Sequence, residues 1–115
     1  MSEFVEYLKE VLGVIGPIRS RRMFGGHGVF HNDLMIGLVA DDVLYLKGDE
    51  KSAEFFTAKG LGQFEYVKNE KTMKMSYFLA PEEIYDDPEE AERWASLAYD
   101  AALRSKKPKK KAAKS

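Results

Sequence analysis

Apolar residues recur every three or four positions near the start of the chain, which predicts an amphipathic helix from Glu3 to Val14. Its apolar side consists of Phe4, Leu8, Val11, Leu12 and Ile15. The dipeptide Gly16-Pro17 ends this helix, because glycine tolerates the left-handed geometry of a helix terminus and proline cannot continue a helix. The chain therefore opens with one short helix that has a single face to bury.

Two further helices are predicted. The last one begins at Asp87, which supplies an N-cap, and it has Pro88 at the first helical position and Glu90 three residues after the cap. Its apolar face is built mostly from small residues, which permit close packing: Ala91, Trp94, Leu97, Ala98, Ala101 and Ala102. A middle helix is expected from Glu50 to Ala58, with Asp49 as its cap, Gly60 at its end, and Ala53, Phe55 and Phe56 buried.

Between the helices, apolar and polar residues alternate with a period of two, which is typical of strands. The predicted strands are residues 18–24, 29–30, 34–39, 43–47, 64–67 and 72–79. Short turns such as His31-Asn32-Asp33 and Ala40-Asp41-Asp42 join antiparallel neighbours, since parallel pairing needs a long crossover. The sequence thus predicts an α+β fold: a two-layer antiparallel sheet of about five or six strands, flanked by N-terminal, middle and C-terminal helices.

Composition narrows the class of protein. The 115 residues are enough for one domain with one core. The chain has no cysteine, which excludes a disulfide framework, a thiolate zinc site and a cysteine nucleophile. The N-terminus has no signal-peptide pattern and no stretch is long and apolar enough to span a membrane, so we expect a cytoplasmic protein.

Charge divides the chain into two parts. Six of its 18 basic residues follow Arg104, and these are Lys106, Lys107, Lys109, Lys110, Lys111 and Lys114. The preceding residues keep 12 basic against 19 acidic side chains, a net charge of −7. We therefore expect an acidic domain over residues 1–104 and a disordered basic tail over residues 105–115. The six tail lysines are candidates for weak, nonspecific nucleic-acid binding, and a merely solubilising end fits them equally well.

One stretch stands out as a candidate site for a partner or an anion, and it consists of Arg19, Arg21, Arg22, Gly25, Gly26 and His27. Paired arginines bind carboxylates in fork geometry, and glycine-rich loops offer backbone N–H groups to anions. The glycine string 25–28 has no Walker lysine and no following helix, so a break or β-bulge in the sheet is the favoured interpretation.

Few residues favour catalysis or metal binding. His27 and His31 are the two imidazoles, and a metal ion would need both with a carboxylate such as Asp33. We predict no catalytic residues, no metal and no cofactor, because no serine occupies a nucleophile elbow and no acid pair stands out. The large apolar residues Met23, Phe24, Met73 and Met75 are expected in the core.

Several motifs resemble the N-terminal domain of the TfoX/Sxy regulators of natural competence. The similarity rests on Arg21-Arg22-Met23-Phe24-Gly25-Gly26-His27-Gly28, on Val43-Leu44-Tyr45-Leu46-Lys47, on Met75-Ser76-Tyr77, and on the late Asp-Pro-Glu-Glu before a helix with Trp94 and Ala98. It covers residues 4–104. The resemblance implies a two-layer α+β domain, commonly dimeric, in transcriptional or competence regulation. Longer members carry a second, helical C-terminal domain, so a stand-alone N-terminal domain is expected here.

Three functions compete on this basis. The first is a regulatory protein-interaction module, a homodimer whose partner is another regulatory protein and whose tail adds weak affinity for nucleic acid. The second is a nucleic-acid-binding protein in which Arg19, Arg21, Arg22 and the tail make the contacts. The third is a small metal-assisted enzyme that uses His27 and His31. We expect no enzymatic activity and no membrane association.

Overall fold

A computed structural model describes residues 3–23 and 25–114, with side chains as far as Lys106. The helices are α1 (Glu3–Leu12), the 3-10 turn η1 (Gly13–Ile15), α2 (Ala53–Ala58), the 3-10 turn η2 (Glu82–Tyr85) and α3 (Pro88–Lys114). The strands are β1 (Arg19–Met23), β2 (Gly26–His31), β3 (Leu34–Ala40), β4 (Val43–Lys47), β5 (Gln63–Lys68) and β6 (Lys71–Leu79).

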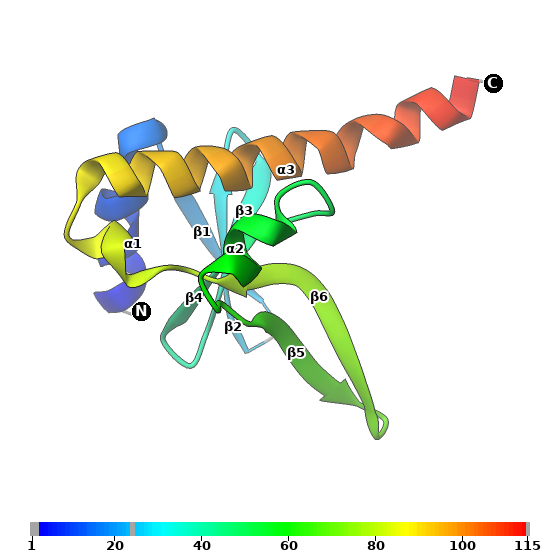
Figure 1. The fold of residues 1–115 in the computed structure, drawn as a ribbon, viewed down its shortest axis with the longest axis horizontal. Helices are drawn as coiled ribbons and strands as arrows, with labels where there is room; N and C mark the ends of the chain where they lie inside the picture. Colours follow the sequence, from blue (N-terminus) through cyan, green and yellow to red (C-terminus); the bar gives the residue numbers. More distant parts are fainter. Residues whose placement is uncertain (1–2, 24, 115) are drawn as a thin grey trace.

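The six strands form one antiparallel sheet in the order β1-β2-β3-β4-β6-β5 (Figure 1). This confirms the predicted α+β fold and its antiparallel sheet. The first four strands follow chain order, and β5 lies outside β6 because the segment carrying α2 separates β4 from β5. Strands β1 and β5 are therefore the two edges of the sheet.

Helices α1 and α3 cover one face of the sheet, and the main core lies between them and that face. Its buried members include Leu8 of α1, Ile36 of β3, Leu46 of β4 and Ala98 of α3. Phe56 of α2 stacks on a β6 ring, Phe78, at a centroid distance of 4.8 Å. The small residues of α3 are buried as predicted, since they let the helix backbone approach the sheet closely.

Three strand connections are two-residue turns in which both residues have positive φ. They are Asn32-Asp33, Asp41-Asp42 and Asn69-Glu70. Turns of this type match the twist of antiparallel strands, and Asn and Asp tolerate the required conformation better than most residues do. The predicted turns are thus confirmed, and each fixes the register of the strands around it.

The glycine string differs from the prediction. Gly25 lies in the turn after β1 with φ 75°, and Gly26, His27 and Gly28 already belong to β2. A Cβ at Gly26 would lie 1.9 Å from the Val39 carbonyl oxygen, so this position needs glycine for close contact with β3. The register shift occurs further on, between Val29 and Phe30. The string is therefore a turn and the start of a strand.

Four burial predictions differ from the structure: Met23 and Met75 are half-buried and lie outside the core, and two other residues are exposed. Phe55 is 47% exposed and Met73 is 43% exposed. Phe55 lies on the outer side of a helix of six residues, which buries only Phe56. Met73 lies on the helix-free face of β6, opposite to the face that carries Phe78 in the core, and it pairs with exposed Tyr66. The predictions made for Phe24 and for the side chains of the tail lysines after Lys106 lie outside the described residues.

An ion pair connects the last helix to the segment before α2. The Arg104 side chain donates from Nε to Asp49 Oδ2 at 2.6 Å and from Nη2 to Asp49 Oδ1 at 2.9 Å. The Asp49 carboxylate also accepts from the backbone N–H of Lys51 and Ser52. The Arg104 hydrogen bonds, with help from Ser52, lower the pKa of Asp49 to about 2.

Beyond Arg104, α3 projects away from the sheet (Figure 1). The tail predicted to be disordered is thus drawn as a continuation of this helix, and its independence from the folded domain stays a prediction. Over the described residues, no helix combines the length and apolar character needed to cross a membrane.

Candidate functional site

The three candidate arginines all lie on edge strand β1, but they do not share one face. Register pairs Arg19 with Phe30, Arg21 with Gly28, and Arg22 with His27. Because side chains alternate along a strand, Arg19 and Arg21 lie on the helix-free face and Arg22 lies on the side of α1. The sequence predicted the cluster, and the structure distributes it around the free edge of the sheet.

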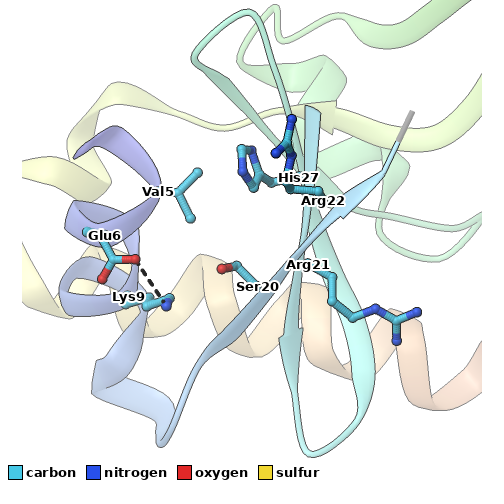
Figure 2. A pocket seen from close by; sticks show the side chains of 7 residues that line it. All are labelled: Val5, Glu6, Lys9, Ser20, Arg21, Arg22 and His27. Atoms are coloured by element: carbon cyan, nitrogen blue, oxygen red, sulfur yellow. Dashed lines mark hydrogen bonds and ion pairs between the residues drawn. The ribbon is translucent and has the colours of Figure 1, made fainter. Parts of the chain in front are cut away.

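A hollow of about 490 Å³ lies between α1 and β1 on the helix side. Figure 2 shows Arg22 and His27 close together at one end, Ser20 in the middle, and the α1 side chains opposite them. From α1 the hollow is lined by Val5, Glu6 and Lys9, and from the sheet by Ser20, Arg21, Arg22 and His27. One wall of the hollow is thus a helix and the other is the edge of a sheet.

A second hollow of about 420 Å³ continues onto the other face. It is lined by Lys9, Ile18, Arg19, Ser20, Arg21, Phe30 and Asp33. Lys9, Ser20 and Arg21 belong to both hollows, so the two meet at the free edge of β1. We call the basic side chains around them, Lys9, Arg19, Arg21, Arg22 and His27, the basic edge.

The arginines of the basic edge have no ion-pair partner among the residues that the structure describes. The salt bridges among the described residues are Lys9–Glu6, Lys59–Glu83, Arg93–Glu90 and Arg104–Asp49, and none of them involves Arg19, Arg21 or Arg22. The Arg21 guanidinium lies 5.5 Å from the centroid of the Phe30 ring, a cation–π contact that orients it along the sheet. In a domain with excess acidic residues, three arginines without a carboxylate leave their hydrogen-bonding capacity open to a ligand.

The two histidines have separate environments. His31 is buried, and its Nδ1 donates to the Pro17 carbonyl at 2.9 Å, which leaves Nε2 to accept from Asn32 Nδ2 at 3.3 Å. Its ring also lies edge-on to Tyr99 with centroids 4.9 Å apart. His27 lies four residues earlier on β2, about 13 Å along an extended strand. The two imidazoles cannot share one metal ion.

Acidic and imidazole side chains do not gather elsewhere either. Within the described residues, no group of three or more His, Cys, Asp and Glu side chains is placed to hold a metal ion. Asp33, the suggested third ligand, lines the second hollow beside Arg19 and Arg21.

The opposite edge of the sheet has a different character. The outer parts of β5 and β6 form a two-stranded hairpin that extends away from the helices (Figure 1). Three of its apolar side chains are exposed: Tyr66 at 40%, Val67 at 70% and Met73 at 43%. Tyr66 and Met73 pair across the two strands and share one face of the hairpin, whereas Val67 points to the opposite face. We call these three residues, which lie on the two faces beside the free edge of β5, the hairpin surface. Beside it, a hollow of about 110 Å³ is lined by Leu38, Val39, Ala40, Phe64, Tyr66 and Met75.

Sequence reasoning missed the hairpin surface and the α1 wall of the basic edge. Alternation along β6 predicted burial for Met73, but alternation does not tell which face of the sheet the helices cover, and Phe78 of the other set packs in the core. Lys9 was not singled out either, since its place in the same hollow as Arg22 depends on how α1 packs. The missing signal is tertiary: which strands are edges and where the helices stop.

Comparison with known proteins gives the family. The family model described as the TfoX N-terminal domain matches residues 10–102. Protein Sxy of Escherichia coli (strain K12) is 26% identical over 98 residues, covering 85% of this chain and 47% of Sxy. DNA transformation protein TfoX1 of Aliivibrio fischeri (strain ATCC 700601 / ES114) is 33% identical over 78 residues, covering 68% of this chain and 37% of TfoX1. The chain thus spans less than half the length of either relative, and it belongs to the TfoX N-terminal domain family.

Proposed function

We propose that this chain is a regulatory protein-interaction module in the control of DNA transformation, and that it works as a homodimer joined through the hairpin surface. The observation that carries the proposal is that apolar side chains are exposed on both faces of the edge hairpin, Tyr66 and Met73 on one face and Val67 on the other. Its proposed place is the cytoplasm, its partner is another regulatory protein, and its role is binding and not catalysis.

The hairpin favours association because few contacts from the rest of the domain stabilise its outer part. A two-stranded hairpin is marginally stable in water by itself, and this one extends past the helices that stabilise the rest of the sheet. An edge strand with exposed Val67 also offers unpaired backbone groups to another strand. A second copy of the same hairpin would cover both the apolar side chains and the open edge.

The regulatory role draws its support from family membership. The A. fischeri relative is named a DNA transformation protein, and its matched region covers much of this domain. The proposal extends that role to this chain. Deleting the gene in its own organism should change the frequency of DNA transformation, and an unchanged frequency would remove this part of the proposal.

The dimer is tested with Val67→Lys, which places a charge in the proposed contact while retaining a strand-compatible residue. Light scattering of size-separated protein should show a dimer for the unaltered chain and a monomer for the variant. Val14→Lys is the matched control, because Val14 is also exposed, at 44%, but lies in η1. A monomeric unaltered chain, or a Val67→Lys variant that remains dimeric, contradicts the proposal.

A second candidate is direct binding of nucleic acid. It is favoured by the three arginines without carboxylate partners and by the tail lysines. Binding through the tail alone should be weak, indifferent to base sequence and steeply dependent on salt, and it should vanish when residues 106–115 are deleted. Fluorescence anisotropy of labelled duplex DNA would favour this candidate if the truncated chain still binds and an Arg21→Ala, Arg22→Ala variant does not.

A further inference from the structure

The free edge of β1 lies in a trough whose other wall is a helix. The trough consists of the two hollows that share Lys9, Ser20 and Arg21. Helix α1 and β1 face each other across it (Figure 2). A groove between an edge strand and a helix is the geometry in which interaction domains add a peptide strand to their sheet, with main-chain hydrogen bonds giving affinity and side-chain pockets giving specificity.

We propose that β1 binds an extended acidic segment of a partner protein as an added strand in this trough. The inference rests on the proposed role as an interaction module and names the chemistry of the partner. Backbone groups on the outer edge of β1 would pair with the segment, because an edge strand leaves every second N–H and C=O without a strand partner. The arginines select for carboxylates, which they bind in bidentate geometry.

The register of the arginines predicts the order of acids in the partner. In an antiparallel added strand, directly opposed residues lie on the same face of the sheet. Positions opposite Arg22, Arg21 and Arg19 would therefore be acidic, and the position opposite Ser20 is free to vary. The expected segment reads Glu-Glu-x-Glu or its Asp equivalents, with one carboxylate toward α1 and two toward the helix-free face.

Charge argues against other occupants. A second copy of β1 would oppose arginine to arginine, and like charges across paired strands are destabilising. Charged edges also protect a sheet against self-association, so the same residues that exclude a copy admit an acidic strand. A DNA duplex presents its phosphates from one side, whereas the arginines are divided between the two faces of β1, so a duplex could not contact all three.

The test uses a synthetic peptide, Thr-Glu-Glu-Thr-Glu-Thr, and the full chain. Isothermal titration at low ionic strength should show binding, and hydrogen exchange at the amides of β1 should slow on addition of the peptide. Arg21→Ala with Arg22→Ala should weaken binding about tenfold or more, since each lost ion pair also leaves a carboxylate without its donors. The matched control Lys51→Ala with Arg93→Ala removes the same charge from other exposed positions and should weaken binding less than about twofold.

A backbone-methylated form of the peptide separates strand addition from plain charge attraction. It keeps every carboxylate but cannot donate backbone hydrogen bonds, so its binding should be lost. Absence of binding by the first peptide, equal binding by the methylated one, or displacement by duplex DNA that needs the same arginines would each overturn the inference. Because Val67 lies at the other edge of the sheet, a failure here and a failure of the homodimer are distinguishable.

Discussion

The two edges of the sheet differ in chemistry although both end the same ladder of strands. The β1 edge carries arginines on both faces and lies beside α1, whereas the β5 edge carries exposed Tyr66 and Val67 and lies beyond the helices. Charge discourages self-pairing at the first edge, and exposed apolar area favours association at the second. One small sheet can thus keep two kinds of contact apart.

The two edges also differ in how they depend on the core. Strand β2 connects β1 to the sheet, and its residue Val29 is buried in the helix-side core. The outer part of the hairpin has no such link, because contacts from β5 are mainly to β6 and, through Phe64, to Tyr45 at 4.8 Å. A change that disturbs β2 should therefore affect the basic edge and the overall stability together.

The largest expected effect follows from Gly26→Ala. The new Cβ would lie 1.9 Å from the Val39 carbonyl oxygen, so β2 must shift away from β3 and carry β1 with it. We expect the free energy of unfolding in urea to fall by about 3 kcal/mol. Gly62→Ala is the control, since a Cβ there meets no atom within 4 Å. Equal stability of the two variants would show that β1 and β2 are not held as described.

How far the sequence alone predicts this molecule depends on whether a feature is local. The three two-residue turns and the α3 cap were predictable, because Asn, Asp and Pro act on their own backbone; Glu89 N–H indeed donates to Asp87 Oδ1 at 3.0 Å. The arginine cluster was also predictable, because its members are neighbours in the sequence. Its division between two faces also follows from alternation along the predicted strand, but the face that α1 covers was not predictable, since that required the register of β1 on β2 and the packing of Val29 in the core.

The exposed hairpin shows the same limit. The alternation of Met73, Met75 and Tyr77 is regular along β6, yet exposure falls from 43% at Met73 to 8% at Tyr77. Periodicity gives the face of a strand and not the extent of its cover. These three residues share the face of β6 opposite to Phe78, which packs on α2, so the helices do not cover them. Their burial depends on side chains of neighbouring strands, such as Lys47 over the Tyr77 ring.

A moderate loss of stability is expected from Arg104→Ala, which removes the ion pair with Asp49 and touches neither edge strand of the sheet. Removing the guanidinium lets the Asp49 pKa rise toward its ordinary value from about 2. Because the folded-state pKa is lowered, the pair stabilises the protein above about pH 4 and loses its effect as pH falls toward 2. Arg104 and Asp49 are partly exposed, so we expect a loss of about 1 kcal/mol at pH 6.

The measurement is urea unfolding of the unaltered chain and of the Arg104→Ala variant from pH 6 to pH 2. The difference between them should shrink over the acid part of this range, while binding at either edge at pH 6 should be unchanged. Arg93→Ala serves as control, since its contact with Glu90 is 3.8 Å long and Arg93 is 69% exposed. A difference that is independent of pH would mean that Arg104 stabilises the fold by packing and not through Asp49.

The smallest effect is expected from deleting residues 106–115. Arg104 already makes the contact that connects the end of α3 to the domain, and the deleted residues include six lysines and only two alanines as apolar side chains. The thermal midpoint should therefore change by less than about 1 °C, because little apolar area is lost. Calorimetry of the full and shortened chains at two salt concentrations would measure it. A clear fall in the midpoint would place the tail within the fold; an unchanged midpoint with unchanged dimer and peptide binding would leave both edges as properties of residues 1–105 alone.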